Sequence, residues 1–127
     1  MKSFLSFFLL IISLGSLAQE NKIKAYLDCR CDENYIKQET SFLEYVRDQD
    51  LADVEIFIRD ERNPTGSRSF EIKIDGNNEY GEISNTTEAV GYANDTSSSL
   101  REKLLNKLKL ALVPFLEKAN YNLTIDV

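Results

Sequence analysis

Residues 52–74 read ADVEIFIRDERNPTGSRSFEIKI, and this stretch decides the fold. Apolar and polar side chains alternate on both sides of the central NPTG, which is the pattern of two strands that are each buried on one face. Within NPTG, Pro64 fixes φ at the second position of a turn, and Gly66 allows a positive φ. The stretch therefore predicts a β-hairpin with strands over residues 52–59 and 70–74.

The same alternation appears at both ends of the remaining chain. Residues 22–28 (KIKAYLD) predict a strand that precedes the hairpin, and residues 121–127 (YNLTIDV) predict a strand that ends the chain. The pattern is weaker after the hairpin, where residues 80–83 and 88–92 each favour a short strand. These segments add four further predicted strands to the two of the hairpin.

Two segments have helical spacing. Residues 33–48 predict one amphipathic helix, or two short helices joined near Thr40, with Ser41 and Glu44 as a capping box for the second part. A longer helix is predicted after the polar cluster 94–99, and Pro114 should kink or end it nearby. Its apolar face is expected to be core, with docking of a partner helix as the alternative; it comprises Leu100, Leu104, Leu108, Ala111, Leu112 and Phe115.

The predicted order is therefore β-α-β-β-(β-β)-α-β. This order favours an α+β fold in which two helices pack on one face of a mainly antiparallel sheet. If the strands at 22–28 and 52–59 lie parallel, the connection between them is expected to be right-handed.

The N-terminus has the three parts of a secretory signal peptide. Lys2 supplies the positive start, Phe4–Leu14 is an apolar run, and Ser16-Leu17-Ala18 places small residues before Gln19. The run is short for a membrane span, which needs about 20 apolar residues, so a retained anchor is the weaker alternative. We therefore expect a signal peptide over 1–18, a single α+β domain over 19–127, and a periplasmic or extracellular location.

Composition excludes several classes of function. The chain carries 15 Lys and Arg against 21 Asp and Glu, and no cluster of basic residues, which argues against nucleic acid and anionic membranes as partners. No second apolar run is long enough to span a membrane as a helix. The chain has no His, so the commonest general base and metal ligand is missing. We therefore expect neither an enzyme nor a bound cofactor or metal.

Cys29 and Cys31 are the only cysteines. In an oxidising compartment they favour a structural disulfide between a strand and a helix. The alternative is a redox or Cu(I)-binding pair, because Cys31 precedes a predicted helix start, where the helix dipole favours thiolate. Asp28 and Asp32 flank the pair and oppose thiolate formation. A zinc site would lack its remaining ligands.

The chain also resembles a group of uncharacterised exported proteins of Gram-negative bacteria. The segments that carry the resemblance cover most of the chain after the signal: LDCRCD at 27–32, NYIKQE at 34–39, FLEYVRD at 42–48, ADV at 52–54, TGS at 65–67 and LKLALVPFL at 108–116. In that group this domain looks like an N-terminal periplasmic module ahead of an outer-membrane β-barrel. Its element order is similar to the α+β module of the N-terminal domain of TolB. The resemblance implies a location and a fold, and it implies no catalytic residues.

Together these observations favour a non-enzymatic periplasmic interaction module that is associated with an outer-membrane protein. Its expected partner is an envelope protein or an outer-membrane β-barrel. The alternative is a small thiol-based redox or copper-handling protein that uses Cys29 and Cys31.

Overall fold

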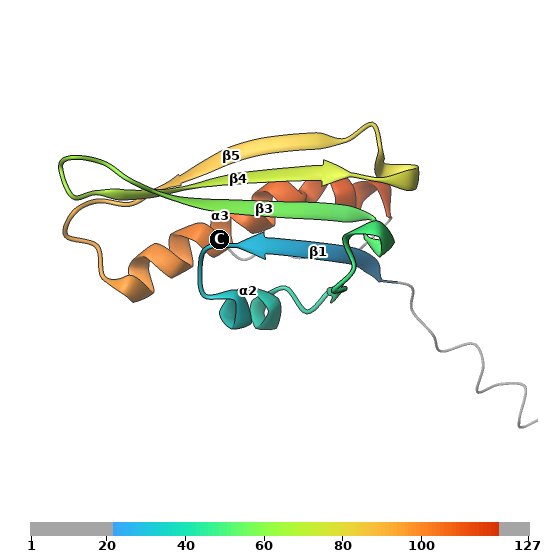
Figure 1. Cartoon of the computed structure of the whole chain (residues 1–127), viewed down its shortest axis with the longest axis horizontal. Coiled ribbons are helices and arrows are strands. Elements are labelled where there is room, and N and C mark those ends of the chain that lie inside the picture. The colour runs from blue at the N-terminus through green and yellow to red at the C-terminus, as the bar shows by residue number, and fades with distance from the viewer. Residues whose placement is uncertain (1–21, 120–127) are drawn as a thin grey trace, which may run out of the picture.

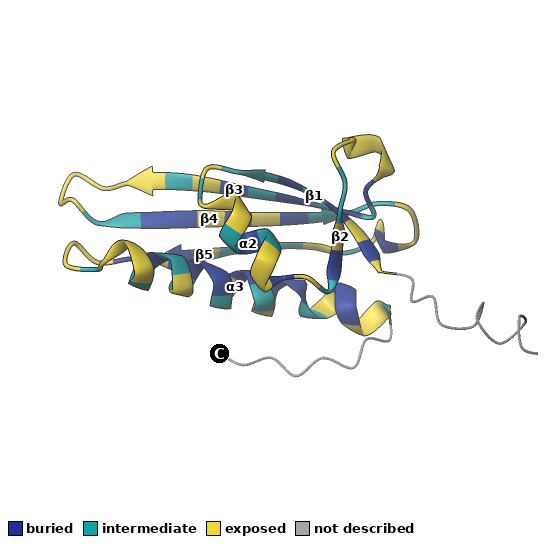
Figure 2. Ribbon diagram, turned by 90° about the horizontal axis from the view of Figure 1, so that it is seen from below, coloured by how far each residue is buried: buried dark blue, intermediate teal, exposed yellow. Residues whose placement is uncertain are grey.

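The computed structural model of the chain describes residues 22–119, which form a five-stranded mixed sheet with two helices on one face. The strand order is β2-β1-β3-β4-β5, and the two longer pairings, β3–β4 and β4–β5, are antiparallel. Figure 1 shows the strands side by side, and Figure 2 shows both helices, α2 and α3, on the same side of the sheet. The predicted α+β class and the placement of both helices on one face are confirmed.

The central hairpin consists of β3 (Val54–Arg62) and β4 (Arg68–Gly76). The two strands pair along their whole length, and Gly66 in the turn has a φ of 87°. The pairing continues further than the apolar alternation predicts. At the charged end of the hairpin, an ion pair between Arg68 and Asp60 at 2.6 Å supports the ladder.

The segment after the first strand corrects the prediction of a helix over 33–48. α2 covers only Glu33–Glu39, and the chain then forms a short strand, β2 (Leu43–Tyr45), parallel to β1 (Ile23–Cys29). The helix ends at the buried Thr40, whose hydroxyl group donates a hydrogen bond to the carbonyl oxygen of Ile36 at 2.6 Å.

The predicted capping box of Ser41 and Glu44 is therefore wrong as well. In so short a stretch, the spacing of Phe42, Leu43 and Tyr45 suits a strand as well as a helix. Pairing with the exposed edge of β1 supplies the backbone hydrogen bonds that a second helical turn would otherwise supply.

β1 carries a different neighbour on each side. Ala25 is the register partner of both Tyr45 in β2 and Val54 in β3, so β2 pairs with the first half of β1 and β3 with the second half. The connection over 46–53 therefore only crosses the beginning of β1, and it contains a 3-10 turn, η2 (Gln49–Leu51). The second half of β1, which ends at Cys29, has no strand on the β2 side within residues 22–119.

The predicted short strands at 80–83 and 88–92 are replaced by one strand, β5 (Ser84–Val90). Tyr80 belongs instead to a 3-10 turn, η3 (Asn78–Tyr80), and its side chain is buried in the core. Tyr80 is therefore an apolar residue that packs in the core from a turn, and it does not belong to an alternating strand.

The second predicted helix is confirmed as α3 (Ser97–Lys118), which begins after the N-cap residue Thr96. Pro114 lies inside this helix, which continues to Lys118 before it ends. Its leucine face is core, as expected: α3 packs against β5 and β4, and its buried side chains belong to the same core cluster as those of β3. The buried residues named from these elements are Leu104, Leu108, Leu112, Val54, Ile56, Phe70 and Ile72.

Two predictions concern residues outside the described range, namely the signal peptide at 1–18 and the strand at 121–127. Neither α2 nor α3, the helices within residues 22–119, is both long enough and apolar enough to cross a membrane.

Candidate functional site

The two cysteines lie where β1 leaves the sheet. The structure joins them as a disulfide between Cys29, the last residue of β1, and Cys31, with their Cα atoms 5.3 Å apart. Both side chains are partly buried and pack against the edge of the hydrophobic core. The disulfide therefore closes the turn between β1 and α2, at the part of β1 that β2 does not cover.

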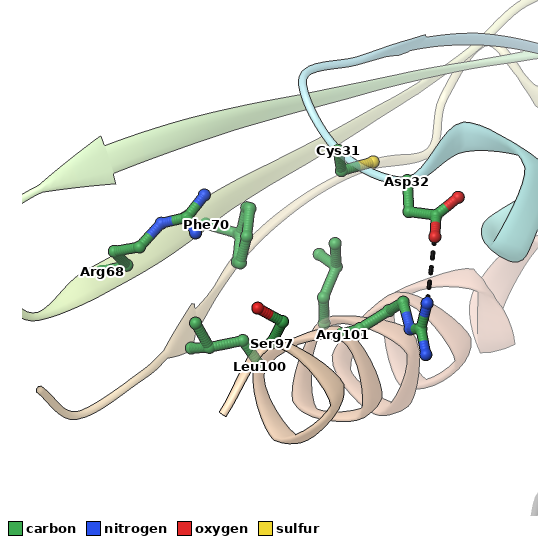
Figure 3. A pocket seen from close by; sticks show the side chains of 8 residues that line it. Cys31, Asp32, Arg68, Phe70, Ser97, Leu100 and Arg101 are labelled. Carbon is green, nitrogen blue, oxygen red and sulfur yellow. Dashed lines mark hydrogen bonds and ion pairs between the residues drawn. The ribbon is translucent and has the colours of Figure 1, made fainter. Parts of the chain in front are cut away.

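Cys31 lines a pocket of about 280 Å³ between this turn and the beginning of α3 (Figure 3). Figure 3 shows side chains from the β1–α2 turn, from β4 and from α3 around the pocket. The lining residues are Cys31, Asp32, Arg68, Phe70, Ser97, Leu100, Arg101 and Leu104.

The two arginines of this pocket are already paired with carboxylates. Arg101 donates to Asp32 at 3.0 Å, and its guanidinium group lies 4.4 Å from the ring centre of Tyr35. Arg68 is paired with Asp60. The pocket therefore presents little unbalanced positive charge, which is a poor environment for stabilising a Cys31 thiolate. One polar atom, Nε of Arg101, is buried and has no hydrogen-bond partner among the described residues.

The chemistry open to this pocket is limited. Within residues 22–119, no group of three or more Cys, Asp or Glu side chains is arranged to hold a metal ion. Cys29 and Cys31 together supply two sulfur atoms that can exchange with an external thiol or, when reduced, bind a soft metal such as Cu(I).

A second feature, the outer edge of β5, was not predicted from the sequence. β5 is the last strand of the sheet, and no strand among the described residues pairs with its outer side. The hydrogen bond from the Gly91 amide to the Arg68 carbonyl, at 2.8 Å, and that from Gly76 to Ile83, at 2.9 Å, set the alternation of the β4–β5 ladder. Because such bonds alternate along antiparallel strands, Thr86, Glu88 and Val90 direct their backbone N–H and C=O groups outward.

Apolar side chains are exposed beside this edge. Val90 is 50% exposed, Tyr92 is 65% exposed and Leu110 is 46% exposed. They line a groove of about 540 Å³ between β5 and α3, together with Glu88, Ala89, Lys103, Asn106 and Lys107. We call the outer side of β5 and this groove the β5 edge surface. The only signal in the sequence was Leu110, which is an apolar residue outside the core face of α3.

Asp95 organises one end of the β5 edge surface. Its carboxylate accepts hydrogen bonds from the Tyr92 amide at 2.6 Å and from the Lys103 ammonium at 2.7 Å. The bond from Lys103 is the main reason that the pKa of Asp95 is lowered. The same bond holds the Lys103 ammonium 4.8 Å from the ring centre of Tyr92. The ionised Asp95 carboxylate therefore links the Tyr92 backbone to the Lys103 side chain at neutral pH.

In comparisons with protein-family models and with curated proteins, the chain matches none of them. The features of the molecule that bear on its function are the pocket at Cys31 and the β5 edge surface.

Proposed function

We propose that this protein is an exported, non-enzymatic interaction module that works beside an outer-membrane protein of the bacterial envelope. The observation that carries the proposal is the β5 edge surface, where outward backbone groups that pair with no strand of residues 22–119 lie next to exposed Val90, Tyr92 and Leu110. An exposed sheet edge is a template for an added strand, and pockets beside it give specificity for side chains. The signal-like sequence at 1–18 supports the location.

Photo-crosslinking in the envelope tests this proposal. The full chain is expressed in a Gram-negative bacterium with a photoreactive residue at Val90 or, as a control, at the exposed Lys73 on the open face of the sheet. We expect a covalent adduct with an envelope protein from position 90 and at least tenfold less from position 73. N-terminal sequencing of the same product should begin at Gln19. Equal labelling from both positions, or a product that retains Met1 in the membrane, would contradict the proposal.

The second candidate is thiol–disulfide exchange, which the placement of Cys31 in a pocket favours. A substrate thiolate would attack one sulfur of the disulfide and form a mixed disulfide. A second substrate thiol would then release the reduced protein, so that the substrate loses two electrons and the pair gains them. When reduced, the same pair would offer two thiolates to Cu(I).

Replacing both cysteines separates the structural from the redox hypothesis. If the pair is structural, Cys29→Ser with Cys31→Ser should lower the free energy of unfolding by less than the roughly 3 kcal/mol of a fifteen-residue loop, because so short a ring restricts the unfolded chain little. The variant should still form the adduct at position 90.

Thiol titration of the native protein gives the starting point. The structural hypothesis predicts no reactive thiol before reductant is added. Two free thiols in protein isolated from the envelope, or a double variant that folds normally but loses exchange with small thiols, would favour the redox candidate instead.

A further inference from the structure

One hydrogen bond shows which residues of β5 and α3 lie at the same level along the groove. The side chain of Asn85 donates a hydrogen bond to the carbonyl oxygen of Ala111 at 3.0 Å, which ties the start of β5 to the second half of α3. β5 and α3 run in opposite directions from this point (Figure 1). Four helical residues rise about 6 Å and two strand residues about 6.8 Å, so Lys107 lies near the level of Thr87.

On the α3 side of this groove one lysine lacks a carboxylate partner among the described residues; Glu88 also lines the groove, but its neighbour Ala89 is buried in the core, so the Glu88 side chain lies on the other face of β5. Lys103 is paired with Asp95, whereas Lys107 is exposed and forms no ion pair within residues 22–119. One turn further along α3, Leu110 exposes apolar surface in the same groove. A strand added to β5 would direct every second side chain toward α3. One of these side chains would face Lys107, and the next one along would face Leu110.

We propose that the β5 edge surface binds an extended segment of another protein in which an acidic side chain and an apolar side chain alternate on the face toward α3. The backbone of the segment pairs with Thr86, Glu88 and Val90, its acidic side chain faces Lys107, and its apolar side chain contacts Leu110. This inference rests on the proposed function, because it names the chemistry of the partner that this surface would bind.

Two synthetic heptapeptides test the inference with the full chain. The first, TVTETVT, places Val, Glu and Val on one face of a strand, and the second, TVTKTVT, replaces Glu with Lys. Binding is measured by the chemical shifts of the Thr86, Glu88 and Val90 amides. We expect the Glu peptide to bind about fivefold more tightly than the Lys peptide, as for an exposed ion pair and its reversal. Lys107→Glu should reverse this preference, and 0.5 M salt should reduce it.

Backbone pairing is tested with a matched pair of variants. Thr86→Pro removes an outward N–H group and leaves the β4 pairing intact, whereas Thr86→Ala keeps that group. Thr86→Pro should weaken peptide binding at least tenfold, and Thr86→Ala should leave it within twofold.

Three results would overturn the inference. If both peptides bind equally while position 90 still cross-links to an envelope protein, the predicted preference for an acidic side chain is wrong and the proposed function stands. If Thr86→Pro binds as well as Thr86→Ala, strand pairing is wrong. If the protein dimerises and Thr86→Pro abolishes the dimer, the occupant is a second copy of this chain.

Discussion

Leu108→Ala is expected to lower the free energy of unfolding by about 2–5 kcal/mol, which is the range for fully buried leucines. Leu108 has 0% exposure at the centre of the helix face that covers the sheet, and it belongs to the same core cluster as Ile56 and Ile72. Removing three carbon atoms here leaves a cavity that the rigid sheet on one side can fill only in part. Urea unfolding monitored by circular dichroism measures the loss.

Leu110→Ala is the matched control, because it makes the same chemical change two residues further along α3. The Leu110 side chain is 46% exposed, so its truncation should change the free energy of unfolding by about 0.5 kcal/mol or less. Equal losses for the two variants would mean that α3 does not bury the Leu108 face against the sheet. If Leu108→Ala lowered the free energy of unfolding by less than 0.5 kcal/mol, the leucine face of α3 would instead be a surface that docks a partner helix.

Gly76→Ala is expected to destabilise the fold by about 1–3 kcal/mol through overpacking. A Cβ atom at this position would overlap the backbone carbonyl group of Tyr80, which belongs to the tight turn after β4. The turn cannot simply move away, because Tyr80 is buried in the core and its carbonyl oxygen accepts a hydrogen bond from the Ile83 amide at 3.0 Å. The midpoint of thermal unfolding should therefore fall by several degrees.

Gly81→Ala provides the comparison within the same turn. A Cβ atom there would come no closer than 3.2 Å to the carbonyl oxygen of Asn78, and the backbone at Gly81 is already helical, with a φ of −62°. This variant should be within about 0.5 kcal/mol of the parent protein. If Gly81→Ala were the more damaging of the two, the close approach of β4 and the Tyr80 turn would be wrong.

The elements that the sequence predicted well are those in which a regular pattern of neighbouring residues continues over a long segment. The hairpin at 52–74 combines regular alternation with a turn whose Pro64 and Gly66 have defined conformational roles, and both strands formed. α3 likewise has a leucine repeat over several turns, and that repeat identified the buried face correctly. The closeness of Cys29 and Cys31 likewise follows from their separation by one residue.

The failures lie where a short segment has two compatible patterns. Residues 41–45 suit a helix or a strand, and the open edge of β1 selected the strand β2. Tyr80 was predicted to lie in a strand, but it lies in a 3-10 turn from which its side chain is buried in the core. The β5 edge surface was missed altogether, because its outward backbone groups and the nearness of Lys107 and Leu110 depend on which strand lies last in the sheet.

By itself, the sequence determined the α+β class, the hairpin, the buried face of α3 and the proximity of the two cysteines. Each of these follows from periodicity or from separation along the chain, which are properties of neighbouring residues. The tertiary structure alone decided the strand order, the end of α2 at Thr40, and the pocket around Cys31. It also decided which strand lies at the edge of the sheet that residues 22–119 form. These features depend on contacts between residues far apart in the chain, and the pairing of distant backbone groups has no signature in any single segment.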